Sequence, residues 1–155
     1  MNKVQLHNKY QPLLLAKNNR YSIVTGGRGS GKSYGLTMYL LLLSMESNHV
    51  ILFTRYTMTS AQISIIPEFL EKIELLGLED MFHVTKTEII NKQSGSKILF
   101  RGIRTSSGDQ TANLKSIQGV TTFVIEEAEE LVDESIFDKI DLSVRSTKRD
   151  NRSII

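Results

Sequence analysis

The sequence predicts an α/β domain with a mainly parallel β-sheet, helices on its faces and an inserted β-hairpin. Short apolar segments rich in β-branched residues alternate with segments whose apolar residues recur at helical spacing. This alternation is typical of parallel strands joined by helical crossovers. A glycine-rich loop at residues 26–33 also separates the first expected strand from the first long helix. Open α/β sheets place their binding sites at such strand ends.

The length and composition are those of one ordinary globular domain. The chain has 155 residues, of which 40% are hydrophobic and 23% charged. It has no cysteine, which excludes disulfides, thiolate metal sites and a cysteine nucleophile. The longest strongly apolar run, residues 38–43, is too short to cross a bilayer, and the N-terminus lacks the apolar core of a signal peptide. The net charge of +2 is weak support for a polyanionic partner.

The first half of the chain alternates strand, helix, strand and helix, at residues 21–25, 34–45, 50–54 and 59–76. Both strands are expected to be buried, because they are short, apolar and β-branched. Pro67 lies inside the pattern of the second helix, so we expect that helix to start or kink there. Gly77 is expected to end it.

The second half opens with an antiparallel hairpin, in which residues 84–90 and 97–101 flank the turn at 93–96. Residues 104–115 are expected to form a polar, turn-rich loop, and residues 122–125 a buried strand that ends in acids. An amphipathic helix is expected at residues 132–144, and a further strand begins at residues 152–155.

The glycine-rich loop fits the P-loop (Walker A) pattern Gly-x-x-x-x-Gly-Lys-Ser/Thr. Between a strand and a helix, its backbone N–H groups and the helix dipole favour a phosphate anion. Lys32 is expected to reach the β- and γ-phosphates, and the Ser33 hydroxyl to ligate Mg²⁺. A chance glycine-rich turn is the alternative, but the strand, the loop and the helix follow one another in the order that a P-loop requires. The sequence therefore predicts a nucleoside triphosphate site at Gly26, Gly27, Arg28, Gly29, Ser30, Gly31, Lys32 and Ser33.

A second pattern is the apolar strand end at residues 123–128, which carries two adjacent carboxylates. This is typical of the Walker B motif of P-loop ATPases. Glu126 is expected to hold Mg²⁺ through its water shell, and Glu127 to orient and deprotonate the attacking water. The alternative is the acidic start of a following helix, whose dipole favours acids in its first turn. We prefer that alternative for Glu129 and Glu130.

Together, the P-loop, residues 99–102, residues 115–117 and residues 124–131 resemble the large terminase subunit of tailed bacteriophages, in particular the branch grouped with the PBSX prophage. The resemblance covers residues 10–155. It implies a P-loop ATPase of the ASCE, RecA-like class. Such an enzyme uses ATP and Mg²⁺ to pump double-stranded DNA into an empty procapsid.

The resemblance also implies partners and a place of action. They are double-stranded DNA, the small terminase subunit, a ring of identical copies on the phage portal, and a C-terminal nuclease domain. No membrane is implied, and the place of action is the host cell cytoplasm rather than the virion. In this family a coupling motif is expected just after Ile155. We therefore interpret residues 1–155 as the N-terminal ATPase domain without its nuclease domain, and expect no nuclease activity from it.

Two further site residues follow from the resemblance, and the role of Arg28 follows from its place in the P-loop. The family places an adenine-recognising glutamine before the first strand, where Tyr10 and Gln11 lie; a surface polar pair is the alternative. Arg28 is expected to contact the γ-phosphate or a neighbouring subunit, or else to point into water. With Lys32 and Glu127 it forms the predicted catalytic set.

The sequence departs from the family pattern at two points. Glu126 stands where many P-loop ATPases have aspartate, although the PBSX-like branch resembles the Glu-Glu form. Several terminases place a trans-acting arginine about a dozen residues before the catalytic glutamate, and this chain has Lys115 and Ser116 there. The candidates for a trans-acting or phosphate-sensing base are Arg55, Arg101, Arg104 and Lys115, each with a solvated surface position or an ion pair as the alternative.

Two other function classes remain open from the sequence. One is an ATP-dependent DNA helicase or recombinase-like motor, which shares both ATPase motifs. The other is a non-catalytic nucleotide-binding regulatory module. The Glu-for-Asp exchange and the short chain are the features that suggest it. Phosphate release measured with and without DNA separates an active motor from a passive module.

Overall fold

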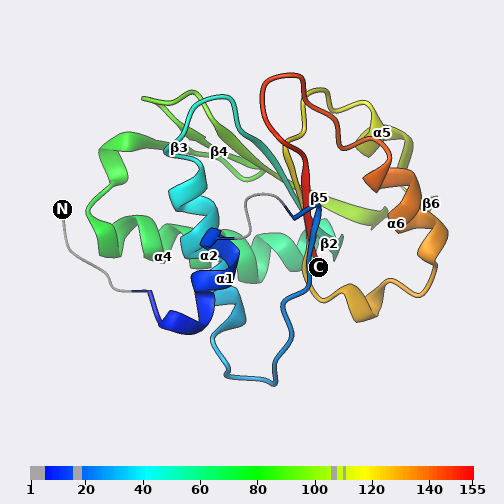
Figure 1. The fold of residues 1–155 in the computed structure, drawn as a ribbon, viewed down its shortest axis with the longest axis horizontal. Coiled ribbons are helices and arrows are strands. Elements are labelled where there is room, and N and C mark those ends of the chain that lie inside the picture. Colours follow the sequence, from blue (N-terminus) through cyan, green and yellow to red (C-terminus); the bar gives the residue numbers. More distant parts are fainter. Residues whose placement is uncertain (1–5, 16–18, 106–107, 110) are drawn as a thin grey trace.

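The strands form one mixed sheet, as the sequence predicts (Figure 1). The computed structural model describes residues 6–15, 19–105, 108–109 and 111–155. Its strands are β1 (Tyr21–Ser22), β2 (Val50–Thr57), β3 (Phe82–Val84), β4 (Glu88–Asn91), β5 (Lys97–Thr105), β6 (Gly108–Asp109), β7 (Thr122–Ile125) and β8 (Arg152–Ile154). Their order is β1-β8-β7-β2-β5-β4-β3, with β6 paired to β5. The pairs from β1 to β5 are parallel, whereas β3, β4 and β6 join in antiparallel fashion.

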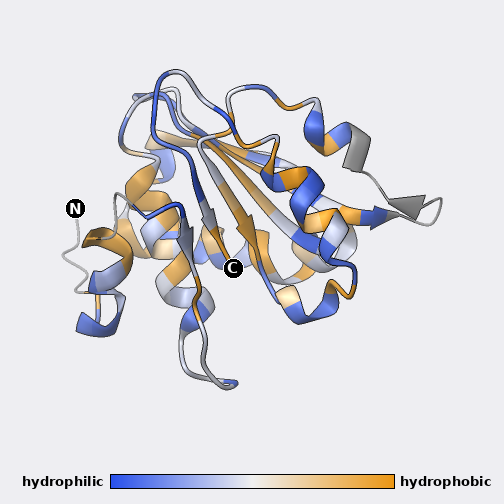
Figure 2. Ribbon diagram, turned by 45° about the vertical axis from the view of Figure 1, so that its right-hand side comes forward, coloured by the Kyte–Doolittle hydropathy of each residue, from blue (hydrophilic) through white to orange (hydrophobic). Residues whose placement is uncertain are grey.

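Helices cover both faces of this sheet. They are α1 (Gln11–Leu15), α2 (Lys32–Leu43), α3 (Met58–Ser60), α4 (Ile66–Leu76), α5 (Thr111–Lys115) and α6 (Glu134–Asp141), with 3₁₀ turns at Asn8–Tyr10, Glu79–Met81 and Ala128–Glu130. Ile51 and Phe53 pack with α2 and α4, while Leu52 packs with α5 and α6. Alternate residues of a strand point to opposite faces, so β2 is buried on both sides. Figure 2 shows hydrophobic central strands between helices that carry both hydrophobic and hydrophilic residues.

Aromatic packing fixes α4 against the sheet beside α2. The ring of Phe69 lies edge-on to Phe53, with centroids 5.9 Å apart, and 5.3 Å from the Phe100 ring. All three side chains are fully buried, and such edge-to-face pairs stabilise a core beyond their buried area. Within the part of the chain that the structure describes, no helix is long and apolar enough to span a membrane.

The start and the end of α4 confirm the roles predicted for Pro67 and Gly77. Pro67 lies in its first turn, and Gly77 caps its C-terminus in the left-handed region, at φ 65°. A π-helical turn at Ala61–Ile65 joins α3 to α4, which apolar spacing did not predict. The predicted hairpin is present as β4 and β5, but its first strand is not continuous over residues 84–90. Residues 85–87 are not part of a strand, and Val84 belongs to β3, which pairs with β4.

The expectation that residues 21–25 form a buried strand is wrong. The strand is only Tyr21–Ser22, the Tyr21 side chain is 50% exposed, and Ile23 is 72% exposed. The reason is the order of the sheet. Among the described strands, β1 pairs only with β8 and so lies at the edge, where an apolar strand remains in contact with solvent.

The prediction of a loop over residues 104–115 is also wrong in part. Arg104 belongs to β5 and pairs in register with Thr57, because β2 continues past the predicted end at residue 54 and its partner continues with it. Residues 108–109 and 111–115 form β6 and α5. Residues 106, 107 and 110 of the predicted loop lie outside the described residues.

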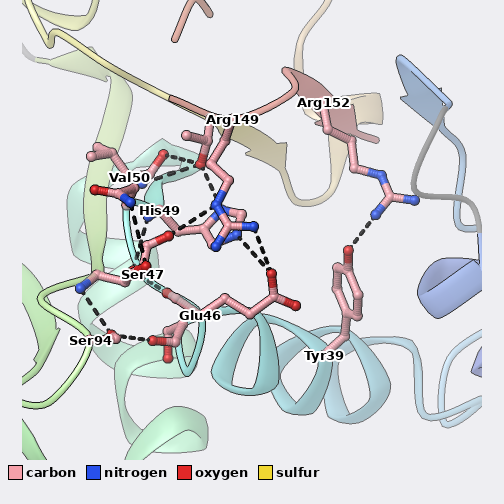
Figure 3. A network of polar contacts seen from close by, with 12 residues as sticks. Tyr39, Glu46, Ser47, His49, Val50, Ser94, Arg149 and Arg152 are labelled. Atoms are coloured by element: carbon pink, nitrogen blue, oxygen red, sulfur yellow. Dashed lines mark hydrogen bonds and ion pairs between the residues drawn. The ribbon is translucent and has the colours of Figure 1, made fainter. Parts of the chain in front are cut away.

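A polar network joins the amino ends of the central strands (Figure 3). Arg149 donates to the Glu46 carboxylate at 2.8 Å and to the Ser47 carbonyl at 3.0 Å. The Nδ1 atom of buried His49 lies 3.1 Å from the Thr121 hydroxyl. Burial lowers the pKa of His49, and the charge of Arg149 lowers it further against the opposing effect of Glu46. The network ties the loop before β8 to the turn before β2.

Candidate nucleotide-binding site

The P-loop connects β1 to α2, as the sequence predicts. Gly31 is the N-cap of the 12-residue α2 at φ 77°, and Gly29 has φ 74°. Both angles lie in the left-handed region that favours glycine. The Lys32 ammonium donates to the carbonyl oxygens of Gly26 and Gly27 inside the loop. The loop therefore surrounds the start of a long helix, where backbone N–H groups attract anions.

The P-loop and the acidic motif line one cavity of about 720 Å³. Its walls come from residues 23–34, Leu36, Glu68, residues 125–129, Ile154 and Ile155. The Ser33 hydroxyl donates to Glu126 Oε1 at 3.1 Å, across 93 residues of sequence. The parallel pairing of β7 with β2 and β8 brings the two motifs to the same edge of the sheet.

Glu126 has the environment of a metal-binding carboxylate. Burial raises its pKa, with smaller contributions from Glu127 and Glu68, while the Ser33 hydrogen bond and the Arg55 charge oppose the shift. Its Oε2 atom is buried and makes no hydrogen bond to the described residues. A buried carboxylate oxygen beside a hydroxyl suits a hard divalent cation, so Ser33 and Glu126 fit Mg²⁺. In the described part of the chain no cluster of three or more metal-ligating side chains occurs.

Glu127 leaves the strand in an uncommon conformation. Its φ and ψ are both 53°, in the left-handed region that few residues other than glycine adopt. Its side chain is 46% exposed and accepts a hydrogen bond from the Arg55 guanidinium. The next residues form only the 3₁₀ turn Ala128–Glu130, and α6 starts later, behind the Asp133 cap. The acids therefore do not form the first turn of an α-helix.

Arg55 is the basic candidate that contacts the acidic motif. It lies within β2 rather than at its end, and Nη1 donates to the Ser64 hydroxyl at 2.6 Å. Its Nε atom is 3.7 Å from Glu126 Oε2. Burial alone would lower the pKa of Arg55, but its contact with Glu127 and the charge of Glu126 raise it overall. The guanidinium thus stays charged between two carboxylates.

The other basic candidates lie elsewhere, apart from Arg28, which is exposed and lines the cavity. Arg101 donates to the Thr87 carbonyl at 3.2 Å, and Arg104 contacts the Tyr56 hydroxyl. Lys115 is exposed at the end of α5. None of these three belongs to the described residues that line the cavity. Their roles toward a neighbouring subunit stay predictions.

Tyr10 lies against the P-loop rather than in the cavity. Its hydroxyl donates to the Gly31 carbonyl, and its ring covers Gly35, where a Cβ would come within 2.1 Å of a ring carbon. It also lines a neighbouring space of about 500 Å³ that includes Ser30 and Lys32. Gln11 is exposed at the start of α1, and its contact with adenine stays a prediction.

Sequence reasoning missed one acid of the cavity, Glu68 of α4. The helix was predicted from its apolar spacing, and a single glutamate on its polar side carries no signal of its own. Burial raises the pKa of Glu68, with Lys72 opposing the shift and Glu71 adding to it.

Comparisons with known proteins agree with the resemblance that the sequence suggests. The family described as "Phage terminase large subunit" matches residues 18–155. The terminase large subunit of Bacillus phage SPP1 is 30% identical over 158 residues, which cover 93% of this chain and 36% of that protein. The PBSX phage terminase large subunit of Bacillus subtilis (strain 168) is 30% identical over 112 residues, 72% of this chain and 25% of that protein. The chain spans about a third of the length of these curated relatives.

Solved structures share the fold. A large terminase from a thermophilic bacteriophage in complex with ADP superposes with a TM-score of 0.71 at 10% identity, over 97% of this chain and 38% of that one. The ATPase domain of the large terminase from Thermus phage P74-26 superposes with a TM-score of 0.66 at 16% identity, over 98% of this chain and 70% of that one. At these identities the similarity establishes the fold, which is that of a terminase ATPase domain.

Proposed function

We propose that this chain, which belongs to the phage terminase large subunit family, binds Mg²⁺-ATP in its cavity and hydrolyses it to drive double-stranded DNA into a procapsid. The observation that carries the proposal is the hydrogen bond between Ser33 and Glu126. It joins the phosphate-binding loop to the acidic strand end, and a nucleotide held by the loop would lie beside the acids. The ADP bound to a structurally similar terminase supports the same use of the fold.

The P-loop would bind the phosphates and the acids would bind the metal. The loop N–H groups and Lys32 face the cavity end of α2, so they would hold the β- and γ-phosphates. Ser33 and Glu126 would hold Mg²⁺ directly or through its waters. When bound, Mg²⁺ neutralises the charge that develops on the transferred phosphoryl group.

Glu127 would act as the general base. Its left-handed backbone turns the side chain out of β7 at the cavity wall, and Arg55 holds the carboxylate there. From that position it would orient a water for attack on the γ-phosphate and accept its proton. Arg28, exposed on the loop, would contact the γ-phosphate or a neighbouring copy of the chain.

The test of this assignment is single-turnover hydrolysis at saturating ATP. Glu127→Gln should keep the affinity for Mg²⁺-ATP and lower the rate by about 10²–10⁴, the usual scale for a lost general base. Glu130→Gln is the matched control, since this acid is exposed on the adjoining 3₁₀ turn and is not among the cavity residues, and it should retain the wild-type rate. A wild-type rate in Glu127→Gln would remove the base from the mechanism.

The DNA half of the proposal has its own test. Phosphate release should rise when double-stranded DNA is added, and the DNA strands should stay paired. Strand separation would favour a helicase instead, and an inert wild-type chain would favour a regulatory module. Within the packaging motor we propose that this ATPase domain works in a ring of copies on the portal, with a nuclease domain and the small terminase subunit.

A further inference from the structure

The segment from α3 to α4 carries polar features that its packing on the sheet does not require. Its π-helical turn includes Ser64, which accepts from Arg55 at 2.6 Å. Glu68 follows in the first turn of α4 and lines the cavity. One turn later Lys72 is 2% exposed, a burial that lysine adopts only with compensating partners. These three residues lie on one helical segment beside the site.

Glu68 shares the cavity with the metal-binding candidates. It is half-buried and lines the same wall as Ser33 and Glu126. With Glu127 and Glu129, four carboxylates therefore border a space that a polyphosphate would enter. Their charges repel a metal-free nucleotide, and they attract the divalent cation that accompanies a metal-bound one.

Lys72 connects α4, which carries Glu68, to the residue that follows the P-loop. Its ammonium lies 4.4 Å from the centroid of the Tyr34 ring, and Tyr34 directly follows Ser33. It also donates to Glu71 at 3.1 Å, and its charge opposes the rise in the pKa of Glu68. The buried cation thus connects α4 to the first turn of α2. A lysine that packs on an aromatic face and pairs with acids in this way orders the helix that carries it.

Ser64 and Glu68 are four residues apart on this segment. Residues at this spacing lie on the same face of a helix, so Ser64 can contact Arg55 while Glu68 lines the cavity.

We propose that Glu68 is a further acidic residue of the nucleotide site, a positioning residue that accepts hydrogen bonds from the waters of nucleotide-bound Mg²⁺. Mg²⁺ gives up its waters reluctantly, so a carboxylate can bind the ion through them. Glu68 then makes nucleotide binding depend more steeply on Mg²⁺, by repelling the bare polyphosphate and retaining the hydrated ion. This inference rests on the proposed function.

The experiment measures binding, not turnover. The affinity of the chain for a non-hydrolysable ATP analogue is determined by calorimetry with and without Mg²⁺, and the ratio of the two affinities is compared between variants. Glu68→Gln should reduce this ratio about tenfold, the lower end of the effect of removing an outer-shell partner of a metal. Glu68→Asp, which keeps the charge on a shorter side chain, should give an intermediate ratio.

Glu71→Gln is the matched control. Glu71 lies on the same helix and accepts from Lys72, but its side chain is 71% exposed and it is not among the cavity residues. The ratio for Glu71→Gln should equal that of wild type. If Glu68→Gln and Glu68→Asp also equal wild type, Glu68 has no role toward the metal. If the wild-type chain does not bind the analogue, or binds it without regard to Mg²⁺, the proposed function itself fails.

Discussion

The two ends of the parallel strands use polar side chains in opposite ways. At the carboxyl end, polar groups line the cavity, and Glu126 Oε2 and Arg55 Nε are buried without a hydrogen bond among the described residues. At the amino end, charged groups bond to one another. Asp141 accepts from the Tyr21 hydroxyl at 2.8 Å, from Arg20 at 3.0 Å and from the Ser153 hydroxyl. The acids at the carboxyl end lie beside the P-loop, where they can bind a ligand, whereas a carboxylate surrounded by three donors stabilises the fold.

Lys32→Ala should give the largest functional loss at the carboxyl end. At an effective dielectric constant of about 20, a cation about 4 Å from a phosphate charge contributes about 4 kcal/mol. Mg²⁺-ATP affinity should therefore fall about 10³-fold with no change in thermal unfolding. Calorimetry measures the affinity, and Lys115→Ala, at an exposed lysine outside the cavity wall, is the control. Equal affinities in wild type and Lys32→Ala would contradict the phosphate-binding role.

Asp141→Asn should do the reverse and reduce stability without affecting the nucleotide. Asp141 is 7% exposed, and removing its charge leaves Arg20 without its carboxylate. We expect a loss of about 3 kcal/mol in the free energy of unfolding, the scale for breaking a buried ion pair. Urea unfolding measures it. Asp138→Asn, at an exposed position on the same helix, should change little. A matched loss of nucleotide affinity would show that the two ends are not independent.

Tyr10→Phe should have a smaller effect, because only one hydrogen bond to the P-loop is removed. The ring stays on Gly35, while the Gly31 carbonyl loses one of its two donors and keeps the N–H of Gly35. A typical hydrogen bond contributes about 1 kcal/mol, so Mg²⁺-ATP should bind about fivefold more weakly. Tyr56→Phe is the control, since its hydroxyl contacts Arg104 instead. If both variants bind as wild type does, Tyr10 supports the loop through its ring alone.

The pH dependence of stability should differ in sign between the two ends. The pKa of His49 lies below its usual 6.5 because of burial, so below pH 6.5 the unfolded chain binds more protons than the folded one. The stabilisation from neutral His49 is complete above that pH and is lost as the pH falls through 6.5 toward the lowered folded value. Glu126 has a pKa raised above 4.5 by burial, so its contribution is present below pH 4.5 and is lost as the pH rises through the folded value.

Denaturant unfolding across this pH range tests both directions. His49→Gln should flatten the rise of the unfolding free energy with pH around 6.5, and Glu126→Gln should steepen it above 4.5. His83→Gln, at an exposed histidine of β3, serves as the control for His49. An unchanged slope in His49→Gln would mean that its burial is not coupled to folding.

The sequence by itself determined the features that depend on neighbouring residues. The strand–loop–helix around the P-loop, the C-terminal cap of α4 at Gly77 and the acidic end of β7 all follow from residues within a few positions of each other. Such features were predictable because backbone conformation and side-chain period act over one or two turns. They identified Lys32, Ser33, Glu126 and Glu127 as site candidates.

Only the tertiary structure decided what lies next to what. The sheet order makes β1 an edge strand and places Arg55 of β2 against the acids that follow β7. It also joins Ser33 to Glu126 across 93 residues. The packing of α4 against α2 brings Glu68 into the cavity and buries Lys72 against Tyr34. No local spacing encodes these contacts, because strand order and helix docking depend on the burial of apolar surface from the whole chain.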